Sequence, residues 1–454
     1  MKIDILIAEI GSTTTVVNAF DLSAPTFIGQ GQAATTVAFG DVRIGLTNAI
    51  VDLEKSLQPA FPKNKIPPLQ NIKMLATSSA AGGLKMCVHG LVYDMTVRAA
   101  KEAALGAGGV LKIITAGKLS DYDIKSVVAE KPGIILVAGG MDYGEKETAL
   151  YNFEKLSKAC PDTPFIYAGN IQNRAQIRCI ADKAGVNVYI VDNVYPSVDT
   201  LNIEPCRAVI QDVFEEHIVE AAGMSKIREL VSGKIMPTPG AVMEAAKLLQ
   251  EAIGDLIVFD VGGATTDLHS VTDGSVEISN MLLAPEPFAK RTVEGDLGVF
   301  VNIGAVVEKV GLEELKREFE NADELIKNMT AIPKTDEEKR FVERLTKACV
   351  YNALHRHAGK LSDFYTPSGK KTVAVGKDLT AVKYLIASGG ALTRLPNGIK
   401  ILQSILEPKT SQKLTPREGA KVLIDNHYIM ASLGVLSMVH KDEALELMKQ
   451  SLAL

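Results

Sequence analysis

The chain has 454 residues, of which 46% are hydrophobic and 23% charged, with a net charge of -5 and a pI of about 5.9. This length predicts two or three domains, and the composition is that of a folded globular protein rather than a disordered one. The absence of an arginine-rich run or basic stripe argues against nucleic acid as the main partner. Five scattered cysteines without a C-x-x-C pair predict free thiols in a reducing cytoplasm.

The first predicted element is an apolar, β-branched run over residues 3–10 that ends at Gly11. It is too short for a membrane span and lacks a signal peptide's cleavage pattern, so we predict a buried strand and no membrane association. Turn signals and hydrophobic spacing then predict strands over 14–20 and 26–33, a helix over 41–56 and a strand over 71–79.

The next stretch alternates strands and helices. Continuous apolar runs at 133–140, 164–170 and 187–193 are separated by helical segments, which predicts a parallel sheet covered on both faces. The segment 237–240 (Pro-Thr-Pro-Gly) indicates a boundary.

A second strand and turn at 255–271 resembles the first in its order of apolar run, acid, glycine and threonines, which we interpret as a diverged duplication. We predict that the remainder is mainly helical, apart from a strand and loop at 384–393. The predicted domains are 1–95 with 236–254 as a first lobe, 96–235 as an α/β elaboration and candidate partner-binding region, and 255–454 as a second lobe.

Three small-residue turns follow predicted strands, at 9–15 (EIGSTTT), 260–267 (DVGGATTD) and 388–391 (SGGA). Glycine lets backbone N–H groups approach an anion closely, and an acid at a strand end can hold a hydrated Mg²⁺. Any one of these turns is also compatible with an ordinary hairpin. Their repetition, with an acid at matching places in two of them, favours a phosphate-binding function.

Other site types find little support. The chain lacks the Gly-Lys-Ser/Thr phosphate loop, a dinucleotide fingerprint that opens a helix, the H-E-x-x-H zinc motif and an esterase elbow. His355 and His357 are two apart, so on a helix they point away from each other, which disfavours a metal site. Asp267 and His269 match the first positions of the cobalamin-ligand motif D-x-H-x-x-G. Thr272 stands where this motif has its glycine, so the motif is incomplete and we interpret His269 as a strand residue.

The three turns resemble the two phosphate loops and the adenosine loop of the superfamily of actin, sugar kinases and heat-shock chaperones. The chain as a whole resembles the glutamate mutase accessory protein family (GlmL, also called MutL, unrelated to the mismatch-repair protein). The segments that carry this resemblance are 6–20 (LIAEIGSTTTVVNAF), 76–86 (ATSSAAGGLKM), 135–145 (ILVAGGMDYGE), 258–271 (VFDVGGATTDLHSV), 290–299 (KRTVEGDLGV), 356–359 (RHAG) and 386–393 (IASGGALT).

The resemblance implies an α/β, two-lobed actin-like ATPase fold with duplicated ribonuclease H-like motifs and an elaborated first lobe. It implies ATP and Mg²⁺ as ligands, and a role as accessory or reactivating chaperone that helps an adenosylcobalamin-dependent mutase or aminomutase to exchange damaged cofactor. By position it places the phosphates at Gly11, Ser12, Thr13, Thr14, Gly262, Gly263 and Thr265, Mg²⁺ and water at Asp260 and Asp267, and adenosine at Gly389 and Gly390.

One position departs from the superfamily, because its first loop begins with Asp and this chain has Glu9. Glu9 could hold a metal through water, but the extra methylene moves the carboxylate by about one bond length, and catalysis is sensitive to displacements of roughly 1 Å. We therefore expect ATP binding and leave its hydrolysis, and the status of the chain as an enzyme, open.

Three other functions share this fold. A small-molecule kinase would use Asp267 as its base, although no substrate motif is visible. A dehydratase activator would need cysteines for an iron–sulfur cluster, and Cys87 and Cys160 lie in unrelated contexts. An actin-like polymer is the third. The mutase served and the oligomeric state remain open.

Overall fold

A computed structural model describes residues 2–12, 14–58, 67–80, 84–220, 223–366, 369–406 and 412–454. Contacts within the chain divide it into two compact units, Met1–Ala241 and Val242–Leu454. The division falls inside helix α7 (Thr238–Ile253), which begins within the segment 237–240.

The first unit contains a five-stranded sheet of order β3-β2-β1-β4-β10. Its central strand β1 pairs antiparallel with β2 and parallel with β4. The four predicted N-terminal strands are confirmed, with ends shifted by up to three residues. The strands are β1 (Ile5–Ile10), β2 (Thr14–Asp21), β3 (Thr26–Ala34), β4 (Met74–Ser78) and β10 (Ile235–Pro237).

The second unit contains a sheet of the same design, in the order β13-β12-β11-β16-β17. Its central strand β11 again pairs antiparallel with the next strand in the chain and parallel with the fourth. In both sheets the chain order 1 to 5 becomes the spatial order 3-2-1-4-5, so the predicted duplication of a ribonuclease H-like motif is confirmed. The strands are β11 (Leu256–Val261), β12 (Thr266–Val271), β13 (Ala289–Glu294), β16 (Tyr384–Ser388) and β17 (Lys421–Ile424).

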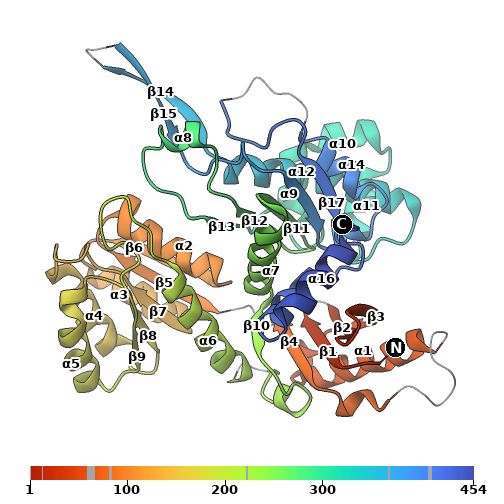
Figure 1. Cartoon of the computed structure of the whole chain (residues 1–454), viewed down its shortest axis with the longest axis horizontal. Coiled ribbons are helices and arrows are strands. Elements are labelled where there is room, and N and C mark those ends of the chain that lie inside the picture. The colour runs from red at the N-terminus through yellow and green to blue at the C-terminus, as the bar shows by residue number, and fades with distance from the viewer. Residues whose placement is uncertain are drawn as a thin grey trace. The chain divides into compact units, whose positions relative to one another are not determined.

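A third, fully parallel sheet elaborates the first unit (Figure 1). Its order, β6-β5-β7-β8-β9, is the doubly wound 2-1-3-4-5 arrangement. Three of its strands match the predicted apolar runs, whereas the two others were not predicted from the sequence. The strands are β5 (Lys85–Gly90), β6 (Val110–Ala116), β7 (Ile134–Val137), β8 (Phe165–Tyr167) and β9 (Val188–Ile190).

Both faces of this third sheet are buried, which explains the continuous apolar runs of its strands. Successive side chains of a strand point to opposite faces. Met86 and Val88 accordingly pack in the core that contains residues of α2 (Arg98–Gly106) and α6 (Glu204–Glu220). Cys87 points to the other face and packs with residues of α3 (Asp121–Glu130), α4 (Glu147–Ala159) and α5 (Arg174–Ala184).

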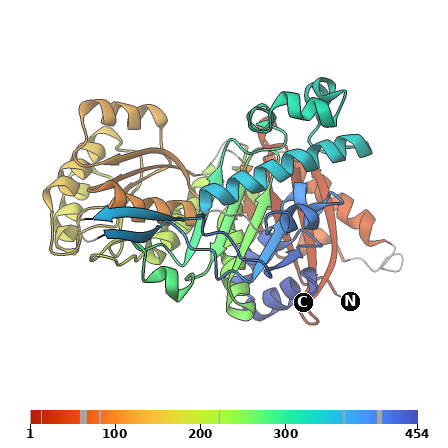
Figure 2. The same cartoon turned by 90° about the horizontal axis from the view of Figure 1, so that it is seen from above.

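Among the described residues beyond 271, more are helical than lie in strands, as predicted, but four strands there were not predicted. Besides β13, β16 and β17, the second unit contains a hairpin of β14 (Lys360–Thr366) and β15 (Gly369–Val375), which extends outward from its unit (Figures 1 and 2). Leu361 and Ala374, at the base of the hairpin, pack on a small core. The described residues of both strands include polar side chains on both faces, so they lack the alternation that reveals a half-buried strand.

Helices pack around the sheets, and several of them begin with a side-chain N-cap. Helix α12, for example, begins with a capping box in which Thr335 and Glu338 bond each other's backbone N–H groups. No described helix is long and apolar enough to cross a membrane. The helices are α1 (Val42–Leu57), α2 (Arg98–Gly106), α3 (Asp121–Glu130), α4 (Glu147–Ala159), α5 (Arg174–Ala184), α6 (Glu204–Glu220), α7, α8 (Val276–Ser279), α9 (Ile303–Val310), α10 (Leu312–Glu318), α11 (Ala322–Asn328), α12 (Asp336–His357), α13 (Gly390–Thr393), α14 (Gly398–Gln403), α15 (Met430–Ser437) and α16 (Lys441–Ser451).

Candidate functional site

The first two glycine turns have the same backbone geometry. Gly11 N donates to Thr14 O over 2.9 Å, and Gly262 N donates to Thr265 O over 2.9 Å. Each turn closes the antiparallel pair at the centre of its sheet. The duplication inferred from the sequence therefore extends to individual hydrogen bonds. Thr13 lies outside the described residues.

The acid before each turn also occupies equivalent positions. Glu9 lies in β1 between Val16 and Thr77, and Asp260 lies in β11 between Asp267 and Ser388. The first unit thus has Val16 where the second has Asp267. Two carboxylates face each other across β11 and β12, whereas Glu9 has no carboxylate at the equivalent place opposite it.

The neighbouring acid changes the pKa of Asp260. Burial, together with the charge of the adjacent Asp267, raises the pKa of the Asp260 carboxyl to about 7, against the opposing effect of Arg291. A carboxyl group with this pKa gains a strong preference for a neighbouring cation once it ionises. A divalent cation beside Asp260 would therefore stabilise the ionised form of this carboxyl group.

Asp267 has a cationic partner that the sequence did not reveal. Arg291 of β13 donates to Asp267 Oδ1 from Nε over 3.0 Å and from Nη2 over 2.7 Å. Both side chains are buried. Thr265 Oγ1 donates to the other carboxylate oxygen over 3.3 Å. This fixes Asp267 as an ion-paired hydrogen-bond acceptor at the end of the turn.

We expect Arg291→Met to destabilise the second unit by about 3–5 kcal/mol, because it leaves the Asp267 carboxylate buried without its cation. Chemical denaturation at neutral pH measures this loss. The double variant Asp267→Asn with Arg291→Met should recover part of it, since the orphaned charge is then absent. A loss below about 1 kcal/mol in the single variant contradicts the buried ion pair.

The carbonyl groups of Gly262, Gly263 and Ala264 in the second turn all accept hydrogen bonds from one segment. A segment over residues 295–302, here called the support loop, donates to Gly262 O from Val299 N, to Gly263 O from Phe300 N and Val301 N, and to Ala264 O from Asn302 Nδ2. These distances run from 2.7 to 3.3 Å.

These hydrogen bonds to the carbonyl groups also orient the N–H groups of the same peptides. In a trans peptide, the C=O and the following N–H point in opposite directions, and the chain has no cis bond among its described residues. The N–H groups of Gly263, Ala264 and Thr265 therefore point away from the support loop, and none of them donates to a described residue. Consecutive N–H groups on one side of the backbone, without a partner among the described residues, are typical of anion-binding sites.

The support loop approaches the turn so closely that a side chain would not fit. A Cβ at Gly298 would lie 2.3 Å from the carbonyl carbon and oxygen of Ala264. Thr266 Oγ1 also donates to Leu297 O over 2.6 Å. The segment 290–299, which carries the family resemblance without an assigned role, thus leads into the support loop and contributes its first part.

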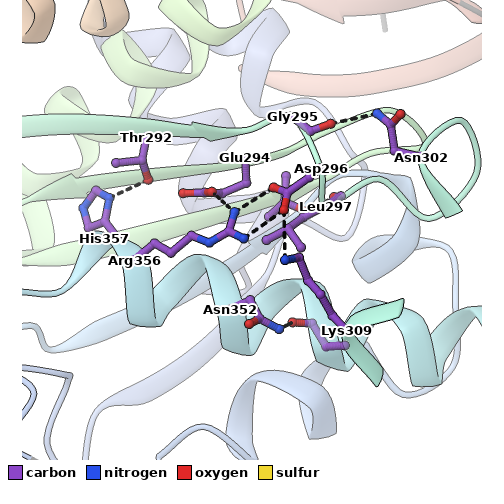
Figure 3. Close-up of polar contacts among 12 residues, drawn as sticks. Thr292, Glu294, Gly295, Asp296, Leu297, Asn302, Lys309, Asn352, Arg356 and His357 are labelled. Carbon is purple, nitrogen blue, oxygen red and sulfur yellow. Dashed lines mark hydrogen bonds and ion pairs between the residues drawn. The ribbon is translucent and has the colours of Figure 1, made fainter. Parts of the chain in front are cut away.

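Charged groups fasten the support loop (Figure 3). Asp296 accepts two hydrogen bonds from Arg356, over 2.7 and 2.8 Å, and pairs with Lys309 over 3.1 Å. Arg356 also donates to Glu294. These cations hold the pKa of the Asp296 carboxyl well below its usual range.

The third turn lies against the second. Gly389 has a φ of +77°, and a Cβ there would lie 2.5 Å from Asp260 Oδ1. Gly390 begins α13 and has open space where a Cβ would stand. In the second unit the structure therefore brings together Asp260, Asp267, the turn 262–265 and Gly389.

The remaining predicted residues occupy the first unit. Glu9, Gly11, Ser12 and Thr14 share the β1–β2 turn, and Thr35 Oγ1 donates to Gly11 O over 2.9 Å. Glu9 is buried, whereas Ser12 is exposed.

The histidines of interest have structural roles. His357 is buried between Thr292 Oγ1 at 2.9 Å and Ser270 Oγ at 2.7 Å, and burial lowers its pKa well below the ordinary value. His269 is fully buried in β12, as a strand residue. Across the described ranges, no group of three or more His, Cys, Asp or Glu side chains is arranged to hold a metal ion.

Duplicated ribonuclease H-like sheets with matching glycine turns define a protein of the actin-like ATPase fold class. Residues 5–452 match the family described as MutL protein. A relative named "Protein MutL" from Clostridium tetanomorphum is 36% identical and covers 98% of both chains. The chain belongs to this MutL family, the glutamate mutase accessory type.

Solved structures resemble the chain only distantly. Nucleotide-free acetone carboxylase has a TM-score of 0.37 at 12% identity, over 95% of this chain and 70% of that one. A glycerol dehydratase reactivase has a TM-score of 0.30 at 9% identity, over 95% of this chain and 100% of that one. Likenesses of this size support no inference about function.

Proposed function

We propose that this protein binds Mg-ATP and serves as an ATP-dependent accessory or reactivating chaperone for an adenosylcobalamin-dependent mutase or aminomutase. The observation that supports nucleotide binding is the row of N–H groups at Gly263, Ala264 and Thr265, none of which donates to a described residue, in the turn that follows Asp260. Consecutive N–H donors and a nearby acid suit a phosphate chain and its Mg²⁺.

The residues divide by chemistry. The N–H groups of Gly263, Ala264 and Thr265 would donate to phosphate oxygens. Ser12, Thr13 and Thr14 of the first turn would do the same. Gly11, whose N–H donates to Thr14 O, would let the backbone approach the phosphate closely. Asp260 would orient Mg²⁺, Asp267 would orient water from its place beside Arg291, and Glu9 would act on the metal through water. Gly389 and Gly390 would lie against the adenosine. When bound, Mg²⁺ would neutralise phosphate charge.

The mutase partner rests on family membership and on the sequence resemblance described above. We place its contact on the elaborated part of the first unit, over 96–235. Loops at the carboxyl edge of the parallel sheet there are tied together by buried asparagines, such as Asn193, which bonds Gly140 O and Asp142. They present Tyr143 with 77% of its surface exposed, and tyrosine is enriched in protein interfaces.

Calorimetric titration of the purified protein with Mg-ATP tests the nucleotide part. We expect a dissociation constant in the micromolar range or tighter. No binding at millimolar Mg-ATP contradicts the proposal.

A pull-down of the mutase with ATP, ADP and no nucleotide tests the accessory role. A nucleotide can change the conformation only through its different affinity for two states. We therefore expect the amount of captured mutase to depend on the nucleotide. Equal capture in all three conditions contradicts an ATP-dependent role.

A further inference from the structure

We propose that Arg356 is a positioning residue for the phosphate-binding turn, acting through the support loop without touching the nucleotide. This inference rests on the proposed function, because it assigns the turn 262–265 to a phosphate chain. It adds a residue from the last turn of α12, far along the chain from the glycine turns.

The first step is electrostatic. Glu294 and Asp296 are separated by one residue and both carry carboxylates, which repel each other unless a cation lies between them. Arg356 is that cation, because its Nη1 donates to both acids and its Nη2 completes a two-point contact with Asp296 (Figure 3). An arginine fork that engages a carboxylate at two points fixes geometry as well as charge.

The second step is mechanical. Asp296 begins the segment whose N–H groups bond the carbonyls of Gly262 and Gly263, and Asn302 ties its far end to Ala264 O and Gly295 O over 2.7 and 2.8 Å. If Asp296 moves, the donors at 299–302 move with it. The peptides of the turn then lose the partners that aim their N–H groups away from the loop.

The third step is anchoring. Arg356 can hold the loop only if its own helix end is fixed. The next residue, His357, is buried and bonds Thr292 of β13 and Ser270 of β12 through its two ring nitrogens. Lys413 Nζ also donates to His355 O over 2.6 Å. The end of α12 is therefore fixed to the sheet, and the guanidinium is held in place.

The test compares Arg356→Met with Arg344→Met. Arg344 lies in the same helix and also bonds two acids, Glu314 and Glu318, but it does not contact the support loop. Hydrogen exchange of the amides at 299–301 reports the loop directly, and titration with Mg-ATP and with inorganic tripolyphosphate reports the turn. Arg356→Lys serves as the conservative variant.

In the Arg356→Met variant we expect the amide hydrogens at 299–301 to exchange at least about fivefold faster than in the wild type. We also expect this variant to bind Mg-ATP and tripolyphosphate about five- to tenfold more weakly. Arg344→Met should match the wild type in both measurements. Arg356→Lys should recover part of the affinity, because lysine supplies the charge without the two-point contact.

Three results overturn the proposal: unchanged exchange at 299–301, faster exchange with wild-type phosphate affinity, or equal losses in Arg344→Met. Failure of the proposed function looks different, because the wild type itself would then bind neither Mg-ATP nor tripolyphosphate. Hydrogen exchange is measured without nucleotide, so it tests whether Arg356 holds the support loop whether or not the protein binds ATP.

Discussion

Replacement of Gly298 by alanine is expected to abolish tight Mg-ATP binding while leaving the protein folded. A Cβ at this position would lie 2.3 Å from the backbone of Ala264, a distance that real Cβ atoms do not tolerate. Because backbone rather than a flexible side chain opposes it, the turn must shift. We expect at least about tenfold weaker binding by calorimetry and a stability loss of about 1–3 kcal/mol.

Gly295→Ala is the matched control. Gly295 belongs to the same loop, has no positive φ, and has no atom within 4 Å of where its Cβ would stand. Its replacement should keep Mg-ATP affinity within about twofold of the wild type and change stability by less than about 0.5 kcal/mol. Equal effects of the two substitutions would show that close approach of the loop to the turn is not needed for binding.

Replacement of Asp260 by asparagine is expected to stabilise the protein at alkaline pH while removing its affinity for Mg-ATP. The pKa of this carboxyl is raised from 3.8 to about 7. The folded protein therefore holds the proton more tightly than the unfolded chain, and the wild type loses stability as pH rises from about 4 to about 7. The neutral amide of the variant avoids this loss, which amounts to about 2–4 kcal/mol.

Urea denaturation between pH 5 and pH 8, in EDTA to remove divalent cations, measures this difference. Asp363→Asn is the control, because hydrogen bonding and ion pairing with Lys370 and Thr372 lower rather than raise the pKa of Asp363. That variant should not gain stability as pH rises. If the free energy of unfolding changes with pH equally in Asp260→Asn and in the wild type, ionised Asp260 does not destabilise the protein.

The sequence predicted the parts of the fold that local patterns encode. The strand β1, with its continuous apolar run and terminal glycine, is correct to within two residues, and the acids Glu9 and Asp260 occupy equivalent positions as expected. Such features depend on neighbours along the chain, so spacing and turn chemistry reveal them.

The features that the sequence left hidden depend on partners distant in the chain. Arg291 is 24 residues from Asp267, and Arg356 is 60 residues from Asp296. No spacing rule connects such pairs. The glycine at 298 was visible as part of GDLG, but its function, to let two backbones meet, appears only once Ala264 is placed beside it.

The distribution of the five cysteines makes the protein convenient for site-selective labelling. Cys179 on α5 is exposed, while the other four thiols are buried. Burial raises the pKa of Cys87, Cys206 and Cys349 to about 12, so these thiols remain protonated and unreactive near neutral pH. A maleimide dye should therefore modify the native protein at one position, on the elaborated part of the first unit. Its fluorescence could report a partner's arrival there without any engineered substitution.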